Sequence, residues 1–379
     1  MNLFQTTAAG RSMAGRFLLT CCIALVLSIA PSVSAQETIA TPIPPIPAER
    51  DAGGIVVPPP IPADSGAVVP EIPAESLPPA DSISVAAPLS PVVSPGYWIV
   101  STHQLSQSFD GCCPAFCPQV YRHDCGAGCR GSSLAELSQS LIPGVPVCIV
   151  VHGSFVDWDS VHSESLCTYR WLQHAQPGMP LQMIYLTWPS NESLTPFVQI
   201  DVAVLGRRAA RNGCYLAGLT QYLPPESPIC LIGHSHGTRV VASSLHILAG
   251  GVVQGCFHPT ARGTGRRMRT VFFAAAVDHD WLNPGERYDR ALCTTECLLN
   301  VRNAHDPALL IYPLRRPFSS RSMGQAGLTS KDRSRLQGWS SKVVEMDLTE
   351  EIGMGHFWPN YYSRPEIARS IRHYVCFTQ

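Results

Sequence analysis

The residues with the clearest chemical potential form the segment I-C-L-I-G-H-S-H-G, which ends in the pentapeptide G-x-S-x-G centred on Ser235. The apolar run predicts a buried strand. Gly233 and Gly237 omit the side chains that would collide where a strand turns sharply into a helix. Thr238 to Ala249 continues with a helical apolar face and stops at Gly250-Gly251. This pattern indicates a serine hydroxyl presented as a nucleophile at a sheet edge.

A serine needs a general base and an orienting carboxylate before it attacks a carbonyl at neutral pH. The pattern of Leu298 to Arg302 predicts a strand, and Asp306 follows it in a loop. Lys342 to Asp347 predicts another strand, after which His356 lies between a glycine and an aromatic residue. The order serine, acid, histidine is typical of sheets with this turn. We therefore predict Ser235 as nucleophile, Asp306 as acid and His356 as base.

Other residues compete for these roles. Asp278 and Asp280 follow a predicted buried strand, Val271 to Val277, and Asp278 is the main alternative acid. His234 and His236 flank the serine in sequence. Because alternate residues on such a turn point apart, we expect both histidines to pack or line a pocket and not to act as the base.

Acyl transfer also needs hydrogen-bond donors for the developing oxyanion. The backbone N–H of His236, at the positive end of the predicted helix, is one candidate. The second is expected in the turn after an early strand, within V-C-I-V-V-H-G-S-F, Val147 to Phe155. There we predict the N–H of Ser154, with Gly153 as the next choice. His152 is expected to hold the shape of this loop by hydrogen bonding.

Six short motifs occur in one order from residue 152 onwards. They are His152-Gly153, Trp188-Pro189-Ser190, the turn at Ser235, Ala276 to Asp280, Asn303 to Leu309, and Gly355-His356. With these motifs the sequence, over roughly Val147 to Gln379, resembles bacterial serine hydrolases of the α/β-hydrolase superfamily. The resemblance implies a doubly wound, mostly parallel sheet with helices on both faces. It also implies hydrolysis of an ester or related acyl bond without a cofactor or metal, but no particular substrate.

The hydrophobic pattern independently predicts an α/β architecture. Strand-like runs mostly alternate with helical stretches, which is typical of a parallel sheet. The long segment Val198 to Leu219 has one apolar face, and a last helix is expected from Pro365 to about Tyr374. The other predicted strands are Trp98 to Ser101, Val147 to Val151, Leu181 to Leu186 and Pro228 to Ile232.

Aromatic residues adjoin the predicted catalytic loops. Trp188, Phe155 and Trp358 are candidate substrate-pocket residues, with Trp158 and Phe357 beside them. Ligands of open α/β sheets bind at the carboxyl edge of the strands, where these loops should meet. An aromatic rim without an adjoining arginine or lysine favours an apolar acyl or aryl group. In the alternative interpretation, Trp188 and Trp358 pack their loops onto the core.

The N-terminal quarter differs in composition from the rest. Met1 to Ala35 contains arginines, then an apolar core, then V-S-A, which is typical of a signal peptide cleaved before Gln36. Export is therefore expected, with membrane attachment only if the signal stays uncleaved. Residues 36–95 contain fifteen prolines and seven acidic residues against one arginine, which predicts an extended acidic linker. Residues 96–379 form the predicted catalytic domain.

The charge and cysteine content bear on partners and compartment. A net charge of −1 gives no reason to expect a nucleic-acid partner. Many of the fifteen cysteines are expected in disulfides after export. Cys148 and Cys230 lie in predicted core strands and are expected to be buried free thiols. A cysteine-rich insertion at about 110–130 favours disulfides, with zinc and His123 as the alternative; its cysteines are Cys112, Cys113, Cys117, Cys125 and Cys129.

These observations favour an exported ester hydrolase acting on a small, apolar acyl substrate. A thioesterase or peptidase could use the same three residues. The rival class is a non-catalytic binding or surface-interaction module on a hydrolase scaffold, attached through the proline-rich segment. All three predicted catalytic residues are present, which favours the enzyme.

Overall fold

The computed structural model describes residues 96–107, 116–191, 198–258, 265–315 and 319–378. The predicted signal peptide and acidic linker, together with Cys112 and Cys113, lie outside these ranges. No helix in the described part is long and apolar enough to cross a membrane.

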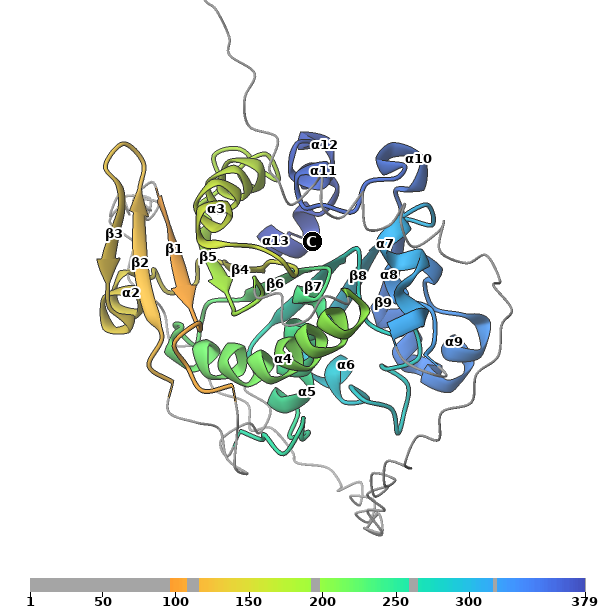
Figure 1. The fold of residues 1–379 in the computed structure, drawn as a ribbon. Coiled ribbons are helices and arrows are strands. Elements are labelled where there is room, and N and C mark those ends of the chain that lie inside the picture. Colours follow the sequence, from red (N-terminus) through yellow and green to blue (C-terminus); the bar gives the residue numbers. More distant parts are fainter. Residues whose placement is uncertain (1–95, 108–115, 192–197, 259–264, 316–318, 379) are drawn as a thin grey trace, which may run out of the picture. The chain divides into compact units, whose positions relative to one another are not determined.

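Nine strands form one sheet in the order β3-β2-β1-β5-β4-β6-β7-β8-β9 (Figure 1). β1 runs parallel to β5, and every later pair is parallel, whereas β2 and β3 add an antiparallel hairpin at one edge. The strands are β1 (Gly96–Ser101), β2 (Gln119–Asp124), β3 (Gly128–Ser132), β4 (Val147–Val151), β5 (Gln182–Thr187), β6 (Ile229–His234), β7 (Met268–Phe273), β8 (Cys297–Arg302) and β9 (Val343–Asp347).

Helices cover both faces of this sheet (Figure 1). The larger are α3 (Trp158–Leu172), α4 (Val198–Leu219) and α5 (Gly237–Leu248). The shorter are α2 (Leu134–Ser140), α6 (Ala291–Thr294), α7 (Pro307–Leu310), α8 (Met323–Ala326), α9 (Ser330–Leu336), α10 (Thr349–Ile352), α11 (Pro359–Tyr362), α12 (Pro365–Ser370) and α13 (Arg372–Cys376). α4, α5 and α6 pack on one face, and α3 and α11 to α13 lie on the other.

The central strands are apolar on both sides because each face is covered. Within β4, Ile149 belongs to the hydrophobic cluster under α4 and α5, whereas Cys148 and Val150 belong to the cluster under α3 and the C-terminal helices. All five residues of β4 are buried. The doubly wound, mostly parallel sheet expected from the sequence is therefore confirmed.

Three local elements differ from the prediction. β7 ends at Phe273 and not at Val277, because Ala274 adopts a positive φ of 45° and takes the chain out of the sheet. The last helix is interrupted at Ile371 and forms α12 and α13. Part of the cysteine-rich insertion folds as the β2–β3 hairpin, and the local sequence pattern did not predict these two strands.

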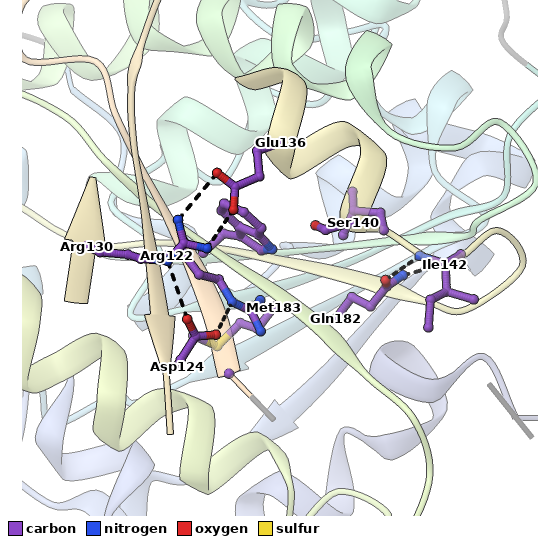
Figure 2. Close-up of a pocket in the computed structure, with 11 residues that line it drawn as sticks. Arg122, Asp124, Arg130, Glu136, Ser140, Ile142, Gln182 and Met183 are labelled. Atoms are coloured by element: carbon purple, nitrogen blue, oxygen red, sulfur yellow. Dashed lines mark hydrogen bonds and ion pairs between the residues drawn. The ribbon is translucent and has the colours of Figure 1, made fainter. Parts of the chain in front are cut away.

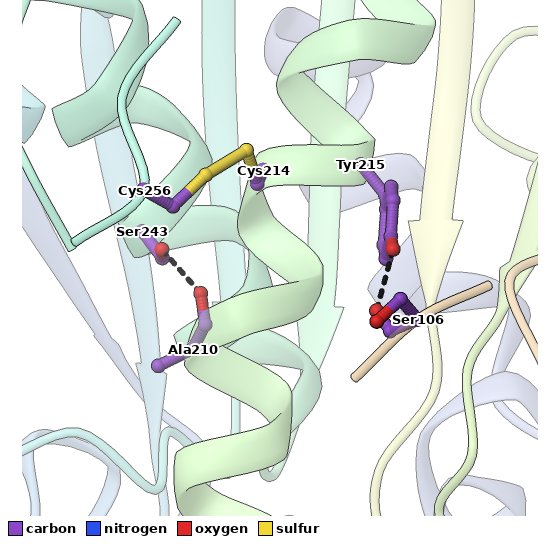
Figure 3. Close-up of a disulfide and its surroundings, with 6 residues drawn as sticks. All are labelled: Ser106, Ala210, Cys214, Tyr215, Ser243 and Cys256. Atoms are coloured by element: carbon purple, nitrogen blue, oxygen red, sulfur yellow. Dashed lines mark hydrogen bonds between the residues drawn. A yellow bond between two sulfur atoms is a disulfide. The ribbon is translucent and has the colours of Figure 1, made fainter. Parts of the chain in front are cut away.

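Cysteine pairing follows tertiary contacts. Cys214 on α4 forms a disulfide with Cys256 after α5, a pair that the sequence did not predict (Figure 3). Cys148 and Cys230 are buried free thiols, as expected. Disulfides were expected in the cysteine-rich insertion, but three of its members are free and exposed, so that expectation is wrong for them. They are Cys117, Cys125 and Cys129. Within the described ranges, no group of three His, Cys, Asp or Glu side chains could hold a metal ion, which leaves the zinc alternative without a site there.

Candidate active site

Ser235 lies in the tight turn between β6 and α5. Its φ is +51°, in the left-handed region that side chains other than glycine seldom adopt. Three backbone hydrogen bonds hold the turn: the Ser235 N–H donates to the Phe273 carbonyl (2.9 Å), and the Ser235 carbonyl accepts from the N–H groups of Thr238 (3.1 Å) and Ala276 (3.3 Å). A Cβ on Gly233 would lie 2.7 Å from the Thr238 Cα, and one on Gly237 would overlap the Val151 carbonyl. Both glycines are therefore required by close backbone approach.

The structure brings the three predicted catalytic side chains into contact. His356 Nε2 lies 3.1 Å from Ser235 Oγ, and His356 Nδ1 lies 2.6 Å from Asp306 Oδ2. Asp306 is fully buried and caps α7, where its Oδ1 accepts hydrogen bonds from the N–H groups of Ala308 (3.0 Å) and Leu309 (3.1 Å). The carboxylate is thus fixed in position, and His356 Nδ1–H can donate to it while Nε2 faces the serine.

Electrostatics suit His356 to accept a proton. Burial by itself would lower the pKa of His356, but the adjacent Asp306 carboxylate outweighs burial and raises the pKa above its ordinary value. The alternative acid, Asp278, is engaged by other residues. It pairs with Arg315 and accepts a hydrogen bond from the Tyr312 hydroxyl at 2.7 Å. Asp306 is therefore the candidate carboxylate that the described structure places against the base.

The loop after β4 lies directly against the serine. A Cβ built on Gly153 would be 3.0 Å from the Ser235 Cβ. Within the described residues, neither the Ser154 N–H nor the His236 N–H donates to a protein acceptor, so both remain available to a ligand. His152 holds the loop, with Nδ1 2.8 Å from the Gly153 carbonyl and Nε2 2.8 Å from Thr187 Oγ1.

The two histidines beside the serine contact different loops. His234 Nε2 lies 2.7 Å from the backbone carbonyl of His356, and burial lowers the pKa of His234 to about 3. The ring is neutral near pH 7, and its Nε2–H donates to that carbonyl. His236 Nδ1 lies 2.6 Å from Ser154 Oγ. The sequence-based expectation that His234 and His236 only pack or line a pocket is therefore incomplete. Each histidine also holds one loop of the site by a hydrogen bond.

Comparisons with known proteins give only distant similarities. No family model and no curated protein matches the chain. A thermostable carboxylesterase cloned from a metagenomic library is 12% identical, with a TM-score of 0.32 over 68% of this chain and 85% of its own. A cutinase-like protein from Cryptococcus sp. is 14% identical, with a TM-score of 0.29 over 62% and 95%. An acetyl xylan esterase is 13% identical, with a TM-score of 0.28 over 61% and 92%.

Two of the three candidate pocket residues are buried in the core. Trp188 is fully buried, stacks on His152, and donates from Nε1 to the His152 carbonyl at 3.0 Å. Trp358 is 2% exposed and donates from Nε1 to Thr168 Oγ1 at 2.8 Å. It also packs edge-on against Trp171. The prediction that both tryptophans line an open pocket is wrong. Each indole is buried and donates its N–H to a buried acceptor, so both side chains pack loops onto the core.

Other apolar side chains remain accessible beside the catalytic loops. Phe155 is half-buried and has a positive φ of 63°. Phe357 is 45% exposed, and its ring lies edge-on to His356. Met354, on the same loop, is 75% exposed. Sequence reasoning missed Met354, although its position two residues before the predicted base was a usable signal.

Sequence reasoning also missed a buried arginine next to the serine turn. Arg239 on α5 is 3% exposed and donates from Nε to the Ala276 carbonyl at 2.6 Å and from Nη2 to the Tyr312 hydroxyl at 3.0 Å. Its position in the sequence, one helical turn after Ser235, could have predicted that Arg239 lies near the serine turn. Arg239 lies on α5 and not on the aromatic loops for which no arginine or lysine was expected.

A cavity of about 300 Å³ lies away from this site (Figure 2). It includes the first residues of β1 and β5, so it is at the amino edge of the parallel strands, opposite the catalytic loops. Its charged side chains pair with one another, as Arg122 does with Asp124 (2.7 Å) and Arg130 with Glu136 (2.6 Å). These ion pairs leave little unmatched charge with which to bind a ligand.

Proposed function

We propose that this chain is an exported serine hydrolase that cleaves an ester or related acyl bond. The observation that supports the proposal is the continuous line of contacts from Ser235 Oγ through His356 to Asp306, at 3.1 Å and 2.6 Å. The three side chains come from separate loops at the carboxyl edge of the sheet. A nucleophile, a base and an orienting acid in this geometry are the minimum set for acyl transfer.

In the first half of the reaction, Ser235 Oγ attacks the acyl carbon while His356 Nε2 takes the hydroxyl proton. Asp306 stabilises the imidazolium and keeps Nδ1 protonated. The carbonyl oxygen gains negative charge and accepts hydrogen bonds from the N–H groups of Ser154 and His236. Loss of one such donor typically slows acyl transfer by about 10²–10³-fold.

The remaining steps complete acylation and then regenerate the enzyme. His356 gives its proton to the leaving oxygen as the bond to the acyl carbon breaks, which leaves an ester on Ser235. Water then loses a proton to His356 and attacks this ester. The acid is released when Ser235 Oγ recovers the proton from His356.

The decisive experiment is covalent labelling of the purified mature protein with a fluorophosphonate. Wild-type protein should be labelled, and Ser235→Ala should not. Ser244→Ala is the matched control because Ser244 is a fully buried serine on α5 whose Oγ has no partner among the described residues. Absence of labelling in folded wild-type protein would favour the non-catalytic binding module.

An apolar acyl group is the substrate that the rim residues favour. Phe155, Met354 and Phe357 offer apolar surface near the base. For p-nitrophenyl esters, kcat/KM should rise from acetate towards medium chains, and Phe357→Ala should reduce this rise. Trp339→Ala is the control because Trp339 is 44% exposed and lies outside the site. A flat profile would remove the apolar preference and leave the catalytic residues unaffected.

Thioesters and activated amides distinguish the other acyl hydrolases that use the same residues. A kcat/KM higher for a thioester than for the matched oxygen ester would assign a thioesterase.

Export is tested separately by the N-terminus of the mature protein. Mass spectrometry of the protein recovered outside the cytoplasm should find Gln36 as its first residue.

A further inference from the structure

The hydroxyl of Ser154 has one hydrogen-bond partner in the described structure, His236 Nδ1 at 2.6 Å. A hydroxyl both accepts and donates, so the direction of this bond decides what the Ser154 proton can do. If His236 Nδ1 carries a hydrogen, it donates to Ser154 Oγ. The Ser154 proton is then left without an acceptor.

The other nitrogen of His236 indicates that direction. His236 Nε2 is buried and has no hydrogen-bond partner among the described residues. It faces α4 beside Arg239: a Cβ built on Gly206 would overlap Arg239 Nη1 and lie 3.4 Å from His236 Nε2. A hydrogen on Nε2 would therefore point towards a buried cation, whereas a lone pair there is stabilised by it.

The charge state of His236 agrees with this tautomer. Burial, and then the charges of Arg239 and Arg315, keep the pKa of His236 well below its usual range. His236 is thus neutral and has a single ring hydrogen, which belongs on Nδ1. Nδ1–H donates to Ser154 Oγ, and the Ser154 O–H is free to donate elsewhere.

The free hydroxyl belongs to the loop that lies against the serine. Ser154 is half-buried, and it follows Gly153, which packs against Ser235. Its bond to His236 joins the two residues proposed as backbone oxyanion donors, and neither of their N–H groups has a protein acceptor in the described structure. The Ser154 hydroxyl thus belongs to one proposed backbone donor residue and is hydrogen-bonded to the side chain of the other.

We propose that the Ser154 hydroxyl is a third oxyanion donor, and that His236, with its tautomer set by Arg239, is the residue that positions it. This inference rests on the proposed function. The Ser154 proton stays on its oxygen throughout and donates a hydrogen bond to the carbonyl oxygen as negative charge develops. His236 acts through Ser154 and does not take part in proton transfer to the substrate.

The test is the single-turnover acylation rate with p-nitrophenyl acetate. Ser154→Ala should slow acylation by about 10²–10³-fold with little change in KM, because a donor used in the transition state is lost. Ser154→Thr retains a hydroxyl and should restore most of the rate. A Thr variant as slow as the Ala variant, with both folded, would overturn the proposal.

His236 variants examine the positioning role. Asn at 236 can place an amide N–H near the position of Nδ1–H, so His236→Asn should acylate faster than His236→Ala. The double variant Ser154→Ala/His236→Ala should be no slower than Ser154→Ala alone, because His236 acts through that hydroxyl. Additive losses would contradict the proposal.

A control separates this result from general weakening of the loop. Ser190 Oγ donates to the Val156 carbonyl of the same loop at 3.3 Å. Ser190→Ala should retain the acylation rate. If Ser154→Ala acylates at the wild-type rate while Ser235→Ala is inactive, the third donor is wrong and the proposed function stands. If Ser235→Ala is as active as wild type, the proposed function itself fails.

Discussion

The ring of His234 hydrogen-bonds to the backbone of His356, with Nε2 2.7 Å from the carbonyl oxygen. The residue before the proposed nucleophile thus holds the loop of the proposed base. The contact spans 122 positions of sequence, and it ties the β6–α5 turn to the segment that carries His356. The alignment of Ser235 with His356 therefore depends on this bond as well as on Asp306.

Replacement of His234 should affect catalysis through position. We expect His234→Ala to lower kcat and leave KM nearly unchanged, because this ring is 6% exposed and acts through the position of His356. His234→Gln can offer an N–H near the original Nε2 and should recover part of the rate. Steady-state kinetics with a soluble ester measure both. Equal kcat losses in the Gln and Ala variants, with unchanged folding, would show that the bond itself is unimportant.

Alanine at each proposed catalytic residue should have a graded effect. Ser235→Ala and His356→Ala are expected to lower kcat by about 10⁴–10⁶-fold and Asp306→Ala somewhat less, as in other triads. Asp278→Ala is the comparison, since Asp278 pairs with Arg315 and not with His356. It should reduce thermal stability more than kcat. A small loss of kcat in Asp306→Ala together with a large loss in Asp278→Ala would reverse the assignment of the acid.

The pH dependence follows from the raised pKa of His356. A base works only when neutral, so kcat/KM should fall as the pH drops through this pKa, above the ordinary value of about 6.5 for histidine. Asp306→Asn removes the charge that raises the pKa, and its acidic limb should move to lower pH. The measurement is the pH profile of kcat/KM for an uncharged ester. An unmoved limb would mean that another group controls it.

Trp358 should contribute mainly to the stability of the fold. It is 2% exposed and packs among Trp171, Phe273 and Tyr361. Trp358→Ala should lower the free energy of unfolding by about 3–5 kcal/mol, which is typical of a large aromatic removed from a core. Denaturant unfolding measures this, with Trp339→Ala as the exposed control. A loss near zero would return Trp358 to the list of pocket residues.

Residues before Gly96 should be dispensable for folding and chemistry. Their prolines, acids and small residues offer little apolar surface to bury. A shortened chain that begins at Gly96 should keep the Tm and the turnover of the mature protein that begins at Gln36. Calorimetry and an ester assay compare the two chains. A large decrease in either quantity would indicate that the linker docks on the domain.

The sequence alone determined the features that depend on neighbours along the chain. The apolar run before Ser235, the glycines around it and the helical pattern after it predicted β6, the turn and α5. Runs of apolar residues likewise predicted the central strands, because a parallel sheet covered on both faces needs nearly continuous hydrophobic segments. The order of Ser235, Asp306 and His356 also followed from motifs read along the chain.

The tertiary structure decided what depends on residues far apart. It brought His356 to Ser235, separated Asp306 from Asp278, and buried Trp358 under the C-terminal helices. It also paired Cys214 with Cys256, about forty residues away, while leaving the cysteines of the hairpin free. No local pattern contains this information, because side-chain packing and hydrogen-bond partners are set by the neighbours that folding supplies from other segments.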